Sequence, residues 1–285
     1  MRIDAHHHFW TPGQRDYYWM AGPELDPIRR PFAPEDMRPL IGEAGIDRTV
    51  LVQTVPSVDE TRDFLVTASE TDYVAGVVGW VDLTAEDVAD VLAALKSGVG
   101  GAYLKGIRHQ VHDEPDPEWL MRSEVQRGIA AVGQAGLVYD LLPKEPELPA
   151  TVACVSANPD VAFVLDHCAK PRIGLGAMDP WAALIEDLSQ CPNVDCKLSG
   201  LVTEANWAEW SVSDLKPYAD HVMSLFGPDR VMFGSDWPVC LLAARDYGQV
   251  HDAAMVLVEP YGAEAVASVF GATAARVYGI PASGA

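Results

Sequence analysis

The chain has 285 residues, of which 49% are hydrophobic, so it is long enough to bury a substantial core. Its 41 acidic and 20 basic side chains give a formal charge of −21, which argues against a nucleic-acid partner because phosphate-backbone binding needs a basic face. No stretch approaches the roughly 20 apolar residues that cross a bilayer, and the N-terminus lacks an export signal, so we expect no membrane partner.

Eight short runs of β-branched and apolar residues recur along the chain, and each is predicted to be a strand. In chain order they span residues 2–8, 48–54, 74–83, 101–109, 137–143, 162–168, 194–200 and 231–238. The longer segments between them have helical spacing, and three of these carry start signals: Ser57 with Glu60, Ser123 with Gln126, and Asp179 before Pro180.

The alternation of strand and helix favours a parallel α/β sheet, and eight units in this length match a (β/α)8 TIM barrel. An open doubly wound sheet would be expected to carry a glycine-rich phosphate loop after its first strand, and none follows "IDAHHHFW". We find no linker or internal repeat, so residues 1–285 are predicted to form one domain. The aromatic-rich segment 9–34 is predicted to be a long loop over the barrel mouth, or alternatively an N-terminal wrap over a barrel end.

The five cysteines are odd in number and form no CxxC pair. This pattern indicates neither a disulfide framework nor a structural zinc site. A reducing compartment fits best, so we expect a cytoplasmic protein; the sequence carries no signal for the number of subunits.

Polar side chains gather at the C-terminal ends of the predicted strands, where barrels of this kind carry their active sites. The first strand ends with His6, His7 and His8. The two-residue period of a strand puts His6 and His8 on one face and His7 on the other. Other strand ends add Lys105, Arg108, His109, Asp166, His167, Lys170 and Asp236.

Each of these residues alone has an ordinary explanation as a solvated loop charge or, for His167, as a hydrogen-bonded core histidine. Together they occupy four strand ends on the predicted catalytic face, with side chains that bind metals, polarise carbonyls or move protons. Asp236 would face the first-strand histidines because the last and first strands of a closed barrel are neighbours.

Six stretches span nearly the whole chain: "IDAHHHFW", "VVGWVDL", "KGIRHQVHDEPDPEWL", "FVLDHCAKP", "CKLSGLVTEANW" and "MFGSDWPVC". In them the sequence resembles the amidohydrolase superfamily, and within it the amidohydrolase-related group of sugar lactonases that includes L-fuconolactonase and L-rhamnono-1,4-lactonase. The resemblance implies a barrel hydrolase that opens a small-molecule sugar lactone, with a role in carbohydrate catabolism.

The resemblance also assigns His6, His8, His167 and Asp236 to the catalytic centre, as candidate metal ligands. The fifth strand lacks the histidine that two-metal members carry, and Lys105 is the one candidate for their bridging lysine. The resemblance therefore implies at most one divalent ion, with Zn²⁺ the first choice, and some members of the group open lactones without a metal.

Lactone opening needs an activated water, a polarised carbonyl and a proton returned to the ring oxygen. We expect Asp236 to be the general base and then to deliver that proton. The carbonyl oxygen would be polarised by the ion, or directly by the imidazoles, His167 among them, together with Arg108 or His109. Alternatively, Arg108 and His109 bind substrate hydroxyls or the product carboxylate.

Four further residues are predicted to contact the substrate: Lys105, Lys197, Trp10 and Trp19. For Lys197 an ion pair with Asp140 is an equal alternative, and for the tryptophans a place in the core. Asp4 is expected to orient His6, since ligating histidines need such partners.

Two rival functions remain at this point. A metal-dependent, non-oxidative decarboxylase is another reaction of the same superfamily, and metal dependence would separate it from a lactonase. A non-catalytic barrel that binds a sugar acid is the second rival, because fold alone does not imply catalysis. Asp236 beside three histidines argues against a pure binder, which has no need of a base.

Overall fold

Eight parallel strands form one sheet in the order β1 to β8 in the computed structural model, which describes residues 1–281. The strands are β1 (Ile3–His7), β2 (Arg48–Val52), β3 (Val74–Gly79), β4 (Leu104–His109), β5 (Val138–Leu141), β6 (Phe163–Leu165), β7 (Val194–Leu198) and β8 (Val231–Phe233). The barrel closes where the His8 N–H donates to the Trp237 carbonyl (2.7 Å) and the Asp236 N–H donates to the His6 carbonyl (2.8 Å). The predicted (β/α)8 barrel is confirmed, and each strand lies within its predicted range.

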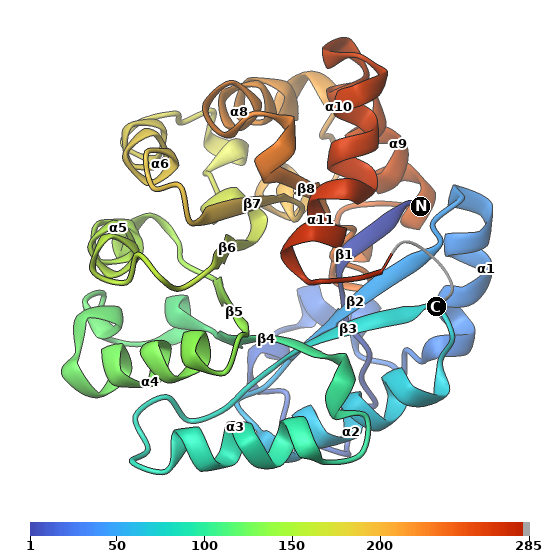
Figure 1. Cartoon of the computed structure of the whole chain (residues 1–285). Helices are drawn as coiled ribbons and strands as arrows, with labels where there is room; N and C mark the ends of the chain where they lie inside the picture. Colours follow the sequence, from blue (N-terminus) through green and yellow to red (C-terminus); the bar gives the residue numbers. More distant parts are fainter. Residues whose placement is uncertain (282–285) are drawn as a thin grey trace.

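Helices surround the strands as an outer ring (Figure 1). They are α1 (Pro34–Ala44), α2 (Val58–Glu70), α3 (Val88–Ser97), α4 (Ser123–Gln134), α5 (Leu148–Ala157), α6 (Trp181–Ser189), α7 (Leu201–Glu204), α8 (Val212–Phe226), α9 (Tyr247–Val258), α10 (Ala263–Ala267) and α11 (Thr273–Val277). Within residues 1–281, none of them has the length and apolar character of a membrane span.

One of the three predicted helix starts is correct. Ser57 caps α2 by accepting a hydrogen bond from the Glu60 N–H. Helix α4 begins at Ser123 itself, with Arg122 in the cap position, and α6 begins after Pro180 rather than after Asp179. These two differences shift the start by one residue, which a capping pattern alone does not resolve.

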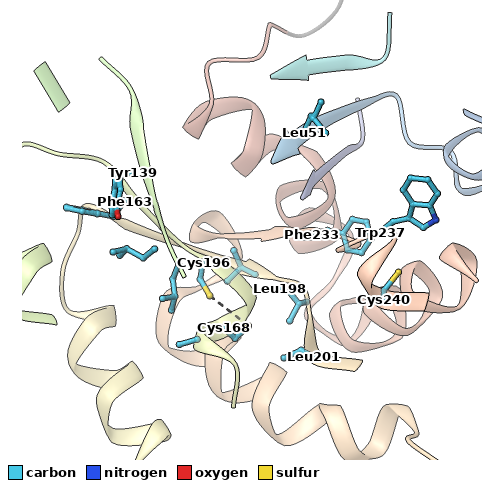
Figure 2. Close-up of a cluster of buried hydrophobic side chains, with 14 of the residues drawn as sticks. Leu51, Tyr139, Phe163, Cys168, Cys196, Leu198, Leu201, Phe233, Trp237 and Cys240 are labelled. Carbon is cyan, nitrogen blue, oxygen red and sulfur yellow. Dashed lines mark hydrogen bonds between the residues drawn. The ribbon is translucent and has the colours of Figure 1, made fainter. Parts of the chain in front are cut away.

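The apolar core has two layers, which the sheet separates. Outside the strands, side chains such as Tyr139, Phe163 and Phe233 pack toward the helices, and Figure 2 shows part of this cluster. Inside the barrel, the N-terminal half is filled by Ile3, Ala5, Val50, Val52, Val78, Val138, Val164 and Met232, joined by Tyr278 and Ile280 from the C-terminal segment. The interior at the other end of the strands is therefore left for polar groups.

Along a single strand, the inward-facing side chains change from apolar to charged at successive positions two residues apart. Val138 is followed two residues later on the same face by Asp140, and Val164 by Asp166. Asp140 and Asp166 are both fully buried. The apolar half of the interior thus supports a layer of buried charges directly beneath the barrel mouth.

The segment 9–34 contains two short 3-10 helices, η1 (Tyr18–Met20) and η2 (Pro23–Ile28). Its two ends pair through reciprocal backbone hydrogen bonds between Trp10 and Phe32. Near its middle, the Trp19 indole N–H donates to the Thr54 carbonyl beyond β2 (3.0 Å), and the Tyr18 hydroxyl donates to Asp113 beyond β4 (3.0 Å). The segment is thereby fixed to two strand ends at the barrel mouth.

Candidate active site

A cleft opens at the C-terminal ends of the strands. Its lining residues are His8, Trp19, Thr54, Arg108, Gln110, His112, Asp113, Leu142, His167, Lys170, Asp236 and Val239. Five residues predicted from the sequence to form the site are among them: His8, Trp19, Arg108, His167 and Asp236. His6 lies directly beneath, fully buried against His8 and Asp236.

Three imidazoles surround one oxygen of Asp236 at the floor of the cleft. The Oδ1 atom of Asp236 lies 3.3 Å from His8 Nε2, 3.8 Å from His6 Nε2 and 3.9 Å from His167 Nε2. His6 Nε2 and His8 Nε2 are themselves 3.2 Å apart. The period-two argument for β1 is met, because His7 turns away from this cluster and its Nε2 contacts the Thr49 hydroxyl (2.9 Å).

The donor set suits a divalent metal ion. Ligand atoms of His6, His167 and Asp236 all lie within 4.8 Å of one another, and tetrahedral zinc ligands are separated by about 3.3 Å. The Nδ1–H of His8 donates to the Val52 carbonyl (2.8 Å), so the Nε2 atom of His8 carries a lone pair that can bind a metal. Burial and nearby positive charges hold the pKa values of His6 and His167 well below the usual range, so both are neutral, as metal ligands must be.

His167 is aimed into the site by an unusual turn. Residues His167, Cys168, Ala169 and Lys170 all have φ between 51° and 57°, the left-handed region that costs about 1–3 kcal/mol per non-glycine residue. The turn is held by the Trp181 indole N–H, which donates to the Cys168 carbonyl (2.7 Å). Such local strain persists only where the surroundings fix it, and here it presents both His167 and Lys170 to the cleft.

Gly200, which follows β7, makes room for the His167 ring. A Cβ atom at Gly200 would lie 2.7 Å from His167 Cγ, and Gly200 itself has φ +65°. The neighbouring Ser199 hydroxyl lies 2.8 Å from His167 Nδ1. The ring is therefore clamped from the side of β7.

A fully buried ion network lies beneath the histidines. Lys197 Nζ is 2.6 Å from Asp140 Oδ2 and 2.9 Å from Asp166 Oδ1, and Arg108 Nη1 is 3.0 Å from Asp166 Oδ2. Burial raises the pKa of Asp140, whereas for Asp166 the charges of Lys197 and Arg108 outweigh burial and lower the pKa. The network reaches the site through His6, whose Nδ1 is 3.2 Å from Lys197 Nζ.

Arg108 has no spare hydrogen-bond donor. A guanidinium offers five N–H groups. Its Nε and Nη2 donate to the side-chain and backbone oxygens of Gln53 (2.5–3.0 Å), and its Nη1 donates to Asp166 and faces His6 Nε2 (3.3 Å). Arg108 is thus a fixed positive charge beside the reacting groups, and a bidentate contact from it to a substrate carboxylate would require it to release Gln53.

Four predicted site residues lie outside the cleft. His109 points to the outer face of β4, where it contacts Trp80 (2.9 Å) and Glu114 (2.7 Å) and stacks on Trp119. Its prediction as a catalytic residue is wrong for a simple reason: Arg108 faces inward, and successive strand residues alternate faces.

Lys105, Lys197 and Trp10 likewise make no contact with the cleft. Lys105 is near the start of β4, beside Gly76, at the opposite end of the barrel from the mouth. Lys197 has no exposed surface and forms the ion pair with Asp140 that was its alternative. Trp10 is 3% exposed, and its indole N–H donates to the Ile28 carbonyl, which confirms the core alternative.

Asp4 orients the first strand through the backbone rather than through the His6 ring. Its carboxylate accepts from the N–H groups of His6 (3.1 Å) and Ser235 (2.9 Å) and from the Tyr247 hydroxyl (3.1 Å). It therefore joins β1 to the segment after β8, which fixes the relative positions of His6 and Asp236.

The sequence reasoning missed the residues that line the upper cleft, namely Gln110, His112 and Asp113, and missed Gln53, which holds Arg108. The signal was present: all four follow or end predicted strands β2 and β4 on the catalytic side.

The chain was compared with known proteins. The family model described as "Amidohydrolase" matches residues 3–280. An L-fucono-1,5-lactonase of Burkholderia ambifaria is 39% identical over 282 residues, which cover 98% of this chain and 96% of that protein. One from Burkholderia multivorans is 36% identical and covers 99% and 97%.

Solved structures give the same assignment. A crystal structure of an amidohydrolase from Burkholderia multivorans with bound zinc superposes with a TM-score of 0.92 at 37% identity, covering 99% of this chain and 100% of that one. The family match, the identity to full-length relatives and the structural similarity all agree with the observed barrel, in which histidines and an aspartate meet at the strand ends. The chain belongs to the amidohydrolase family.

Proposed function

We propose that the protein hydrolyses a sugar-derived lactone, of the L-fucono- or L-rhamnono-lactone kind, to the open-chain sugar acid. The observation that carries this proposal is the Asp236 carboxylate, which faces three imidazoles at the floor of an open cleft. Two relatives at 36–39% identity over nearly the full chain bear the name L-fucono-1,5-lactonase, which supports this substrate class.

Asp236 acts as the proton carrier of the reaction. It takes a proton from the attacking water as the new C–O bond forms at the lactone carbonyl. As the ring C–O bond breaks, it returns the proton to the departing ring oxygen, so that one group serves both steps. Its backbone N–H is bound to the His6 carbonyl and its carbonyl accepts from the Cys240 N–H, which fixes the side chain relative to the histidines.

The carbonyl oxygen develops negative charge during this attack, and the chain places positive charge nearby. Arg108 is buried and held by Gln53 and Asp166, so its charge is preorganised before the substrate arrives. A divalent ion, which we propose to be Zn²⁺, would be held by His6, His8 and His167 with Asp236 and would supply a Lewis acid for the carbonyl. A relative of 37% identity was solved with zinc, which supports this ion.

A two-metal centre does not fit these residues. The inward carboxylate of β5, Asp140, is engaged by Lys197, and Lys105 lies at the other end of the barrel. The decarboxylase alternative is the weaker interpretation because the relatives of 36–39% identity are named as lactonases. A non-catalytic binder is disfavoured by the placement of Asp236 among the imidazoles.

A role in carbohydrate catabolism and a cytoplasmic location belong to the same proposal. The five cysteines are all free thiols, which favours a reducing compartment.

Acid release in weak buffer from a panel of aldonolactones tests the proposal. We expect wild-type protein to open at least one lactone, and Asp236→Asn to lower kcat by at least about 10²- to 10⁴-fold with an unchanged far-UV circular dichroism spectrum. Asp72→Asn, an exposed carboxyl remote from the cleft, is the matched control and should retain full activity.

A chelator arm separates the two ways of polarising the carbonyl. Loss of activity on chelation, restored by Zn²⁺, supports the ion at the histidines. Retained activity assigns polarisation to the imidazoles and Arg108. If metal-loaded wild type opens no lactone while it decarboxylates an aromatic acid, the proposed function is wrong.

A further inference from the structure

Among the residues that line the cleft, three titratable side chains have no part in the reaction above: His112, Asp113 and Lys170. His112 and Asp113 lie in η4 (Val111–Asp113), directly after β4, and Lys170 ends the left-handed turn after β6. Their hydrogen-bonding capacity decides which chemical groups this part of the cleft can bind.

Lys170 is a cation with donors to spare. Its ammonium offers three N–H groups, and one of them is bound by Glu204 Oε1 at 2.7 Å. Its side chain is 16% exposed and lines the cleft. The other lining cation, Arg108, donates four of its five N–H groups to Gln53 and Asp166, and the fifth faces His6 at the floor of the cleft rather than the space beside Lys170. Among the described lining residues, Lys170 is therefore the cation that can donate to a ligand without breaking a contact.

His112 presents an acceptor to the same space. Its Nδ1 is 3.1 Å from the Leu142 carbonyl, which can only accept, so the proton sits on Nδ1 and Nε2 keeps its lone pair. Burial, with the charges of Lys170 and Lys144, lowers the pKa of His112 to about 3, so the ring is neutral near pH 7. His112 and Lys170 line the same cleft, so an acceptor and a donor are presented to one space.

Asp113 adds a second acceptor beside the first. Its Oδ2 accepts from the Tyr18 hydroxyl (3.0 Å), and its Oδ1 lies 3.4 Å from His112 Nε2. The lone pair of the neutral imidazole and the carboxylate oxygen are therefore two neighbouring acceptors that face the cleft without a donor from each other. The opposite tautomer of His112 would only move the mismatch to the shorter contact with Leu142. One ligand hydroxyl could donate to His112 Nε2 and a neighbouring hydroxyl to Asp113 Oδ1.

We infer that His112, Asp113 and Lys170 form a hydroxyl-recognition subsite for the ring hydroxyls of a neutral, polyhydroxylated lactone. A sugar hydroxyl both donates and accepts, so neighbouring hydroxyls match an ammonium donor beside two acceptors. A dicarboxylate is a poor match, because a single cation has free donors and Asp113 repels a second carboxylate. This inference rests on the proposed function and extends it to the substrate class.

The test compares two substrates that differ in their hydroxyl groups. Wild type and Lys170→Met are assayed by acid release on an aldonolactone and on unsubstituted γ-butyrolactone. Because a hydrogen bond to a charged group is at stake, Lys170→Met should lower kcat/KM for the aldonolactone by about 10- to 100-fold, mainly through KM. Its kcat/KM for γ-butyrolactone should stay within about twofold of wild type, because that substrate has no hydroxyl to lose.

His112→Phe is a second variant that keeps a planar aromatic ring while removing the acceptor, and it should discriminate between the two substrates in the same direction. Lys216→Met is the matched control, because Lys216 forms an exposed pair with Asp220 on α8, outside the cleft. It should change neither kcat/KM, and all variants are checked for wild-type melting temperature.

Four outcomes overturn the inference. Equal losses on both substrates would make Lys170 a positioning residue for His167 rather than a hydroxyl contact. No loss on the aldonolactone for either variant would remove the subsite. Wild type that opens γ-butyrolactone as fast as the aldonolactone would also refute it, while leaving the lactonase assignment in place. If wild type opens neither lactone, the proposed function itself fails, and the inference fails with it.

Discussion

Replacing Lys197 with methionine should destabilise the fold in a way that depends on pH. Lys197 has no exposed surface and neutralises two buried carboxylates, Asp140 at 2.6 Å and Asp166 at 2.9 Å. In the variant, Asp166 keeps its contact with Arg108, 3.0 Å away. Asp140 keeps only the Tyr278 hydroxyl as a hydrogen-bond donor (2.8 Å), so it becomes a buried charge without a counter-ion.

The loss of unfolding free energy can be calculated from the least costly response of the variant, in which Asp140 takes up a proton. Holding a carboxyl neutral at pH 7, when its pKa in the unfolded chain is about 3.9, costs about 1.4 kcal/mol per pH unit, or about 4 kcal/mol. This is the upper limit of the deficit, because the pKa of Asp140 is already raised to about 6 in wild type, which carries part of the same cost. This agrees with the about 3–5 kcal/mol measured when one partner of a buried pair is removed.

The pH dependence has a definite sign. The folded variant holds a proton on Asp140 that the unfolded chain releases above about pH 4, so raising the pH favours unfolding. Wild-type Asp140 has a pKa raised to about 6, so at pH 5 it is protonated as well; the deficit relative to wild type should therefore shrink as the pH falls from 7 to 5 and grow again toward pH 7.

Urea denaturation followed by far-UV circular dichroism at pH 5, 6 and 7 measures these values. Lys216→Met, which breaks an exposed pair, should change the unfolding free energy by less than about 1 kcal/mol at every pH. Adding Asp140→Asn to Lys197→Met removes the orphaned charge and should restore most of the loss. A deficit below about 1 kcal/mol at pH 7, or one that does not vary with pH, would refute the reasoning.

Two further substitutions test how the catalytic groups are held. Gly200→Ala should lower kcat/KM at least about tenfold, because the added Cβ would press on the His167 ring. Gly136→Ala is the control, since Gly136 has a similar φ of +70° and no atom within 4 Å of an added Cβ. It should lower the unfolding free energy by about 1 kcal/mol and leave activity unchanged. Equal activities of the two variants would contradict the clamp. Arg108→Lys should lower kcat/KM by at least about 10²-fold in the lactone assay, since an ammonium cannot reproduce the planar set of donors to Gln53; retention of more than a fifth of the activity would contradict this role.

The sequence was sufficient for the fold because the barrel is encoded locally. Each strand is a short apolar run between segments of helical spacing, and all eight runs form strands within their predicted ranges. The same local rule placed His6 and His8 together and His7 apart. In β4 the same rule separates Arg108, which faces the barrel interior and Asp166, from His109, which faces outward and contacts Trp80.

The sequence could not show how far along the barrel axis a residue lies or which distant residues it contacts. The strand period tells which face a residue occupies, but it does not tell how far along the barrel axis it lies, so Lys105 and Asp236 look alike as strand residues yet lie at opposite ends. Whether a charged group meets substrate depends on contacts between residues far apart in the chain. Lys197 forms an ion pair with Asp140, which is 57 residues away in the chain, whereas Lys170 keeps free hydrogen-bond donors.

The sequence by itself therefore determined the barrel, the mouth at which chemistry occurs and the residue types gathered there. The tertiary structure decided which of those residues face the cleft, which neutralise one another beneath it, and which keep hydrogen-bonding capacity for a ligand. The reason is physical: backbone periodicity is a local property, whereas burial, ion pairing and hydrogen-bond saturation arise only when the strands are closed into a ring.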